Sequence, residues 1–303
     1  MPLIGYLDSG WPDARQAEYQ TLRAELARHL GEEGEGFILV PRGGDVARHA
    51  VELLEQEQVE VLVAFGTDTV RVAAETAAKG AGGERPPTPV VMASISDPLG
   101  LGPELVETLD RPGRHVTGLT SLAPQLTGKR LQILKEAFPG VARVMFLRSD
   151  SPGDDQEQLE FDEAANRLQV APLIETAGSA AQISVAFADA VAAGADAVLA
   201  AASTFIVNHR LPVASLAAQY RLPAMYAQRE LAEAGGLMAY SPNYRDMFQR
   251  AAGFVVKILD GVPPGILPID RARRFSLVLN RQAARDLNFT VPRGLLAQLD
   301  EIL

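Results

Sequence analysis

Short apolar runs alternate with stretches of helical periodicity along almost the whole chain. Apolar runs of about four to eight residues without a polar face are typical of strands that are covered on both sides, as in a parallel sheet between helices. The alternation therefore predicts an α/β fold. In the first part of the chain it predicts strands at Leu3 to Asp8, Gly36 to Arg42, Val59 to Gly66, Pro89 to Ile95 and Val116 to Thr120.

Helical patterns separate these strands and then lead into a second series of the same kind. The first group lies near Ala14 to Leu30, Asp45 to Gln56, Thr69 to Lys79 and, shorter, Pro103 to Leu109. A helix at Gln125 to Phe138, ended by Pro139-Gly140, opens the second series. Its strands are predicted at Arg143 to Ser149, Ala171 to Thr176, Ala197 to Ser203, Pro223 to Gln228 and Leu237 to Ser241. Its helices are predicted near Asp154 to Gln169, Ala180 to Ala193, Asn208 to Tyr220 and Arg229 to Ala234.

The last part of the chain predicts a return to the first series. A long amphipathic helix, Tyr244 to Leu259, precedes a final strand at Phe275 to Asn280 and a short helical tail at Val291 to Leu303. We therefore expect two doubly wound parallel-sheet lobes joined by a hinge. The N-terminal lobe is expected to span 1–118 plus about 242–274, and the C-terminal lobe 119–241 plus about 275–303. The expected hinge segments are Thr117 to Ser121, Tyr240 to Asn243 and the stretch before Phe275.

Composition removes several classes of function. The 28 basic and 38 acidic residues give a formal net charge of -10, which repels phosphate backbones, so we expect no nucleic-acid partner. The chain has no cysteine, which excludes disulfides, thiolate catalysis and cysteine-ligated metals. No apolar run reaches the roughly 20 residues that a membrane-spanning helix needs. The opening Leu3-Ile4-Gly5-Tyr6-Leu7 is typical of a core strand and not of a signal peptide.

Enzyme signatures are missing as well. The four histidines, His29, His49, His115 and His209, lie far apart and show no metal-ligand spacing. The sequence has no Gly-x-Ser-x-Gly elbow and no phosphate-binding loop, and its first strand leads into Asp8-Ser9-Gly10, which lacks the dinucleotide fingerprint. We therefore expect no catalytic activity, no cofactor and no metal site. A sugar epimerase or isomerase would need a convergent acid/base pair, and the carboxylates are scattered.

Polar residues follow nearly every predicted strand. In open α/β sheets ligands bind beyond the carboxyl ends of the strands, where loops and helix N-termini gather. These ends therefore supply the candidate ligand-binding residues, which are Asp8, Ser9, Gly66, Thr67, Asp68, Thr69, Ser94, Ser96, Asp97, Ser149, Asp150, Ser203, Thr204, Tyr226, Gln228 and Tyr240.

Each candidate also has a plain structural interpretation. Gly66 to Thr69 would bind a carboxylate through hydroxyls and backbone N–H groups, or would only cap the following helix. Asp97 would neutralise an ammonium group, or would form a turn stiffened by Pro98. Asp8 and Asp150 would face a cationic group, or each would cap the following helix or lie in solvent. Tyr226 and Tyr240 would stack on a flat ligand or belong to the rim of the core.

Many ordered blocks of the sequence resemble one known family. They include Ile4-Gly5-Tyr6-Leu7, Val61-Leu62-Val63-Ala64-Phe65-Gly66-Thr67, Ser96-Asp97-Pro98-Leu99-Gly100, the block from Leu109 to Leu119, Leu126-Thr127-Gly128-Lys129-Arg130-Leu131, the block from Arg221 to Tyr226 and the block from Glu233 to Asn243. The chain resembles ABC-transporter substrate-binding proteins related to tryptophan and phenylalanine binders, which have the type I periplasmic-binding-protein architecture.

The resemblance implies a function and a location. It implies a periplasmic protein or an extracytoplasmic membrane-anchored lipoprotein whose signal segment is absent from this sequence. It further implies that hinge closure captures a small ligand between the lobes, with the Gly66-Thr67 turn and Asp97 on one side. The expected ligand is an amino acid, aromatic ones included, or a related small carboxylate, and the expected partner of the monomeric protein is a membrane permease.

Two departures from the family pattern leave the ligand open. Arg148-Ser149-Asp150 stands where a Trp-Asn-Pro-like turn is usual, and Ala202-Ser203-Thr204 replaces a Pro-Asp-Pro-like turn. The alternative function is a ligand-sensing effector domain of the same fold. Such a domain would carry a DNA-binding helix-turn-helix before the first strand, where only Met1 and Pro2 are found.

Overall fold

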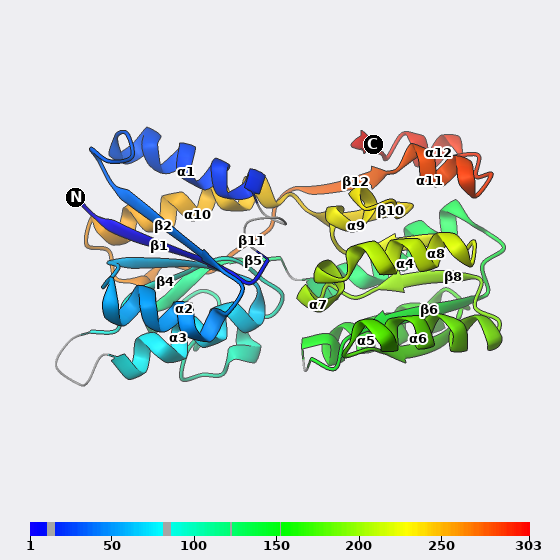
Figure 1. The fold of residues 1–303 in the computed structure, drawn as a ribbon, viewed down its shortest axis with the longest axis horizontal. Coiled ribbons are helices and arrows are strands. Elements are labelled where there is room, and N and C mark those ends of the chain that lie inside the picture. Colours follow the sequence, from blue (N-terminus) through cyan, green and yellow to red (C-terminus); the bar gives the residue numbers. More distant parts are fainter. Residues whose placement is uncertain (11–15, 81–85, 122, 152) are drawn as a thin grey trace. The chain divides into compact units, whose positions relative to one another are not determined.

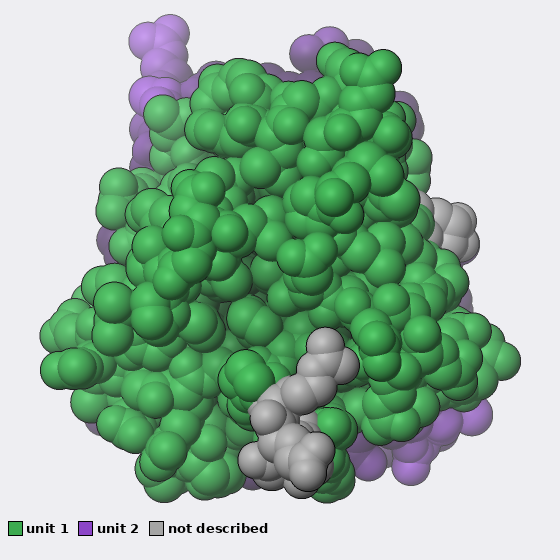
Figure 2. Space-filling model, turned by 90° about the vertical axis from the view of Figure 1, so that its left-hand side faces the viewer, with its two compact units in different colours: residues 1–122, 243–274 green, residues 123–242, 275–303 purple. Residues whose placement is uncertain are grey.

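The computed structural model describes residues 1–10, 16–80, 86–121, 123–151 and 153–303. The chain divides into two compact units, coloured separately in Figure 2. Unit 1 consists of Met1–Leu122 and Asn243–Arg274, and unit 2 of Ala123–Pro242 and Phe275–Leu303. The chain therefore passes from one unit to the other after residues 122, 242 and 274.

Unit 1 is built on a parallel sheet of six strands among the described residues, in the order β11-β5-β4-β3-β1-β2. The strands are β1 (Leu3–Asp8), β2 (Ile38–Gly43), β3 (Val61–Phe65), β4 (Val90–Ile95), β5 (Val116–Thr120) and β11 (Asp270–Arg271). The helices are α1 (Gln16–Leu30), α2 (Val46–Val51) with its π-helical continuation η1 (Glu52–Gln56), α3 (Thr67–Gly80) and α10 (Tyr244–Leu259), and two short 3₁₀ turns lie at Leu99–Leu101 (η2) and Pro264–Ile266 (η3).

Both faces of this sheet are apolar because each is covered by helices (Figure 1). Successive side chains of a strand point to opposite faces. Accordingly, Val61 and Val63 of β3 pack with α1 and α10, whereas Leu62 and Ala64 pack with α2 and α3. This arrangement explains why β3 is apolar along its whole length.

Unit 2 contains a sheet of seven strands in the described part of the chain, in the order β13-β12-β10-β9-β8-β6-β7. They are β6 (Arg143–Arg148), β7 (Ala171–Thr176), β8 (Ala197–Ala200), β9 (Ala224–Tyr226), β10 (Met238–Pro242), β12 (Phe275–Leu279) and β13 (Glu301–Ile302). The pairing is parallel except between β10 and β12. The helices are α4 (Ala123–Ala137), α5 (Gly153–Arg167), α6 (Ala180–Ala192), α7 (Thr204–Asn208), α8 (Arg210–Gln219), α9 (Arg229–Glu233), α11 (Arg281–Asp286) and α12 (Arg293–Leu296).

The predicted α/β class with two sheet-based lobes is confirmed, and most predicted strands and helices are found within a few residues of their expected bounds. The first residues of the helix predicted from Ala14 lie outside the described residues. None of the helices in the described ranges is long and apolar enough to cross a membrane.

The short helix predicted at Pro103 to Leu109 is wrong. The N–H groups of Leu105 and Val106 both donate to the carbonyl of Gly102, which forms a single turn. The next N–H group, that of Glu107, donates to the carbonyl of Pro112, 2.9 Å away, and not to a carbonyl one helical turn earlier. Because the returning chain supplies this acceptor, the helix does not continue.

The prediction of a helical tail from Val291 to Leu303 is only partly correct. Helix α12 covers Arg293–Leu296, and the chain then adds β13 beside β12. The N–H of Asp300 donates to the carbonyl of Leu277 at 3.0 Å, and its carboxylate accepts from the N–H of Leu277 at 2.7 Å. The tail pairs with β12 because the backbone groups at that edge are open to it. The local sequence pattern of the tail does not show that such an edge lies nearby.

Gly118 in β5 allows a close backbone contact and supports a stability prediction. Its φ is +128°, and a Cβ there would lie 2.3 Å from the carbonyl oxygen of Met92 on β4. Gly118→Ala is therefore expected to lower the free energy of unfolding by at least about 2 kcal/mol, since it combines strain with a clash. Urea denaturation measures the change. Gly253→Ala in helix α10, where a Cβ meets nothing within 4 Å, is the control and should raise stability by up to about 1 kcal/mol.

His115 supports a prediction about how stability changes with pH. Its Nε2 lies 3.0 Å from the carbonyl oxygen of Ala74 in α3, and burial lowers the pKa of the ring although this bond opposes the change. As pH falls below the unfolded value of about 6.5, the unfolded chain takes up a proton that folded His115 resists, so stability decreases. His115→Gln should flatten this decrease in thermal-melting midpoints between neutral and mildly acidic pH. Identical slopes in the two proteins would contradict this assignment.

Candidate functional site

The carboxyl edge of the unit 1 sheet brings together candidates from three strands. Parallel pairing aligns Asp8 of β1 with Phe65 of β3, and Phe65 with Ser94 of β4. Consequently the loops that begin at Ser9, Gly66 and Ser96 leave the sheet at the same edge. Trp11, which follows Gly10 in the sequence, lies outside the described residues. The sequence argument that placed Asp8, Ser9, Gly66 to Thr69, Ser94, Ser96 and Asp97 at one edge thus matches the arrangement of the strands.

The turn from β3 into α3 presents hydrogen-bond donors at this edge. Gly66 has a φ of 90°, and its N–H donates to the carbonyl of Ser94 at 3.0 Å. Helix α3 begins at Thr67, and its N–H···O bonds start with Val70, which donates to the Gly66 carbonyl at 2.9 Å. The N–H groups of residues 67 to 69 therefore have no acceptor within the helix. Together with the helix dipole, they favour an anion at this point.

Both aspartates of this edge take part in local turns. Asp97 is exposed, and its Oδ1 accepts from the N–H of Leu99 at 3.0 Å. Asp8 is buried, and its two oxygens accept from the hydroxyl of Tyr6 at 3.0 Å and from the N–H of Gly10 at 2.9 Å. Asp97 thus keeps its carboxylate at the surface of unit 1, whereas Asp8 stiffens the first loop from within.

An aromatic pair that the sequence argument missed also lies at this edge. Phe65, the last residue of β3, meets Tyr244 edge-to-face with ring centroids 5.4 Å apart, and both rings are half-buried. Tyr244 opens α10, directly after the capping residue Asn243. The sequence does show Asn243-Tyr244 at the start of the long predicted helix. However, Tyr244 lies beside β3 only because that helix returns to unit 1.

The carboxyl edge of the unit 2 sheet also brings predicted residues together, but their hydrogen bonds point inward. The Ser203 hydroxyl donates to Ser149 Oγ at 3.1 Å, and the Ser149 hydroxyl donates to Asp154 Oδ2 at 2.7 Å. The N–H of Ser149 donates to the same carboxylate oxygen at 2.8 Å. Ser149 and Ser203 therefore order the turns after β6 and β8. Asp150 is exposed beside them, and Thr204 is the half-buried first residue of α7.

Beneath this edge lies a buried ion pair that was not predicted. Arg130 of α4 is 0% exposed, and its Nη1 donates to Glu157 Oε1 of α5 at 2.9 Å. The Thr127 hydroxyl donates to the same oxygen at 2.7 Å, and Glu157 Oε2 accepts from the N–H of Ala202 at 2.8 Å. Arg130 Nε donates to the carbonyl of Tyr240 in β10 at 2.9 Å. Burial raises the pKa of Glu157, while Arg130 and the other two donors act in the opposite direction.

The remaining three candidates occupy different environments. Gln228 follows β9 and is 5% exposed, and its Oε1 has no hydrogen-bond partner among the described residues. Tyr240 is half-buried and stacks on Phe275 with centroids 6.0 Å apart. Tyr226 is fully buried, which raises the pKa of its hydroxyl, and it lines a small pocket with Leu222 and Leu237. Those two residues precede β9 and β10, so this pocket lies toward the amino edge of the sheet.

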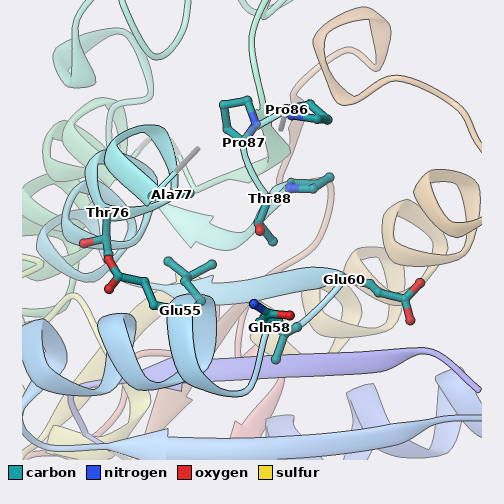
Figure 3. A pocket seen from close by; sticks show the side chains of 12 residues that line it. Glu55, Gln58, Glu60, Thr76, Ala77, Pro86, Pro87 and Thr88 are labelled. Carbon is teal, nitrogen blue, oxygen red and sulfur yellow. The ribbon is translucent and has the colours of Figure 1, made fainter. Parts of the chain in front are cut away.

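One cavity in the described residues lies away from the candidate residues at the carboxyl edges. It measures about 650 Å³ and lies at the amino edge of the unit 1 sheet. Figure 3 shows its lining, which comes from the turn before β3 (Gln58), from α3 (Thr76) and from the stretch before β4 (Pro87 and Thr88). The described residues also contain no group of three or more histidine, aspartate or glutamate side chains that could hold a metal ion.

Comparison with known proteins identifies the group to which this architecture belongs. Residues 44–303 match the family model described as ABC transporter substrate binding protein. A search of curated proteins found no match.

Solved structures match the whole chain at low sequence identity. A conserved domain protein from Vibrio cholerae is 23% identical, with a TM-score of 0.88 over 100% of this chain and 99% of that one. The ABC domain from Streptococcus pneumoniae, solved in complex with L-Trp, is 22% identical, with a TM-score of 0.82 over 99% and 100%. A ligand-free, open substrate-binding protein with adhesive properties from Clostridium difficile is 16% identical, with a TM-score of 0.73 over 99% of each chain. These similarities confirm the predicted type I fold.

The buried ion pair yields a stability prediction. Glu157→Ala should lower the free energy of unfolding by about 3–5 kcal/mol, because it leaves the Arg130 guanidinium buried without its counter-charge. Urea denaturation followed by circular dichroism measures the loss.

A matched control is the exposed pair of Arg229 and Glu301, in which Nη2 and Oε1 lie 2.8 Å apart. Since solvent screens this pair, Glu301→Ala should cost no more than about 1 kcal/mol. Equal losses in the two variants would show that burial does not govern the contribution of the Arg130–Glu157 pair.

Proposed function

Since the chain belongs to the ABC transporter substrate-binding protein family, we propose that it captures an amino acid or a related small carboxylate for an uptake transporter. The members of this family bind a substrate and do not transform it. On this proposal the ligand is held between the carboxyl edges of the two sheets, and unit 1 supplies the groups that recognise its charges.

The observation that carries the proposal is the pairing of opposite chemistries on neighbouring strands. The turn after β3 offers the N–H groups of Thr67, Asp68 and Thr69, and the turn after β4 offers the exposed carboxylate of Asp97. Adjacent strands lie about 4.8 Å apart. A small zwitterion is long enough to place its carboxylate on the first turn and its ammonium group near the second. Neither a neutral sugar nor an anion without an ammonium group would use both.

Gln228 supports a ligand contact from unit 2. An amide oxygen that is buried without a partner carries a desolvation cost of about 1–3 kcal/mol. An N–H or O–H group of the ligand would remove that cost. The position of Gln228 after β9 is also where ligands bind in open α/β sheets.

Transport requires that the bound and empty forms differ. We propose that the three chain passages after residues 122, 242 and 274 bend, so that ligand binding shifts an equilibrium between open and closed forms. The relative from Clostridium difficile was solved in a ligand-free, open form, which supports such an equilibrium in proteins of this fold. A membrane permease would then recognise the closed monomer outside the cytoplasm, where proteins of this family typically act.

The decisive experiment is release of the natural ligand. Protein purified without refolding is denatured, and small molecules in the supernatant are identified by mass spectrometry. A thermal-shift screen over the standard amino acids, starting with L-tryptophan, and over small carboxylates follows. A true ligand at one hundred times its Kd should add about 2.7 kcal/mol of stability. If no molecule is released and no compound stabilises the protein, the proposal is wrong.

The role of Asp97 is tested by Asp97→Asn. Asparagine can still accept from the N–H of Leu99, so the change removes the charge and keeps the turn. We expect affinity for the amino acid that binds best to fall at least about tenfold, as for a lost hydrogen bond to a charged group. Affinity for the same molecule without its ammonium group should not change. Isothermal titration calorimetry measures both affinities. The control is Asp45→Asn, which neutralises another exposed aspartate, at the N-cap of α2, and should leave both affinities unchanged.

A further inference from the structure

The Arg130–Glu157 pair places two opposite charges among the buried side chains of unit 2. Arg130 is the largest fully buried side chain in the described residues, and the side chain of Glu157 is 3% exposed. Removing two charges from water is costly, and apolar side chains of similar volume often stabilise a fold equally well or better. Stability alone therefore does not explain the pair, and its contacts indicate what else it does.

The first group of contacts fixes the turn after β8. Glu157 Oε2 accepts from the N–H of Ala202 at 2.8 Å, and Ala202 precedes Ser203, whose hydroxyl meets Ser149. The carboxylate of Glu157 is thus bonded directly to the turn after β8, which is itself bonded to the turn after β6. Both turns belong to the carboxyl edge of the unit 2 sheet.

The second group of contacts links two segments that cross between the units. Arg130 lies on α4, which begins at Ala123, the first residue of unit 2. Its Nε donates at 2.9 Å to the carbonyl of Tyr240, two residues before the chain leaves unit 2 after Pro242. One guanidinium group thereby ties the entering segment to the leaving segment. Neither Arg130 nor Glu157 is accessible to a ligand, so both act through the groups that they hold.

We propose that Arg130 and Glu157 are positioning residues, which hold the turn at Ala202–Ser203 and the end of β10 in the geometry that ligand binding requires. This inference rests on the proposed function. It adds to that function two buried residues that act on the carboxyl edge of the unit 2 sheet without touching the ligand.

Glu157→Gln tests the inference with almost no change in volume. The amide keeps one oxygen, but whichever way it turns, its NH₂ group faces either the Ala202 N–H or the Thr127 and Arg130 donors. We expect hydrogen exchange at the Ala202 amide to accelerate at least tenfold and affinity for L-tryptophan, or for the standard amino acid that binds wild type best, to fall at least tenfold. Glu301→Gln, in the exposed pair with Arg229, should change neither.

A second variant separates positioning from folding. Arg130→Met combined with Glu157→Leu replaces the ion pair by apolar side chains and should cost less stability than Glu157→Ala, because no charge stays buried without its partner. We expect this variant to bind the same amino acid at least tenfold more weakly. Wild-type affinity in the folded double variant would overturn the positioning role, as would unchanged exchange at Ala202 in Glu157→Gln.

Failure of the proposed function would look different. If wild type binds none of the amino acids, the proposed ligand class is wrong. Hydrogen exchange is then the measurement that tests whether Glu157 positions the turn. Faster exchange at Ala202 in Glu157→Gln, but not in Glu301→Gln, would still support it.

Discussion

Parallel pairing of strands is the constraint on which the rest of this structure depends. It sends all carboxyl ends of the unit 1 sheet to one edge and requires connections that cover both faces of the sheet with helices. Both faces must then be apolar, as the two sides of β3 show. Polar side chains that serve a ligand are therefore found where strands end, and the edge from Asp8 to Asp97 meets this condition.

The two carboxyl edges satisfy their polar groups in different ways. In unit 1 the N–H groups at the start of α3 have no acceptor within the helix, and Asp97 remains at the surface. In unit 2 Ser149 and Ser203 bond to each other and to Asp154, and Glu157 holds the next turn from below. On the function we propose, unit 1 supplies charge recognition. Unit 2 supplies turns held by internal hydrogen bonds and the buried amide oxygen of Gln228, which has no hydrogen-bond partner among the described residues.

The sequence predicted what depends on local pattern and on the geometry of parallel sheets. Strands such as β1 and β5 have their predicted bounds. The rule about carboxyl ends placed Gly66 to Thr69 at the edge where they are found, and their ligand-binding role stays a prediction. What it missed depends on partners far along the chain. The tail forms β13 because β12 has an open edge, and Tyr244 meets Phe65 because α10 returns to unit 1. No window of the sequence contains both members of these pairs.

The sequence did not predict the Arg130–Glu157 ion pair for a further reason. Arg130 follows Lys129 in a helical pattern, and Glu157 belongs to an acidic stretch of α5, so each has the sequence surroundings of a solvent-exposed residue. Only the packing of α4 against α5 buries both. An arginine suits this place because its planar fork donates in several fixed directions, here to Glu157, Thr127 and Tyr240 at once. A lysine ammonium group could replace the charge but not the geometry that joins α4, α5 and β10.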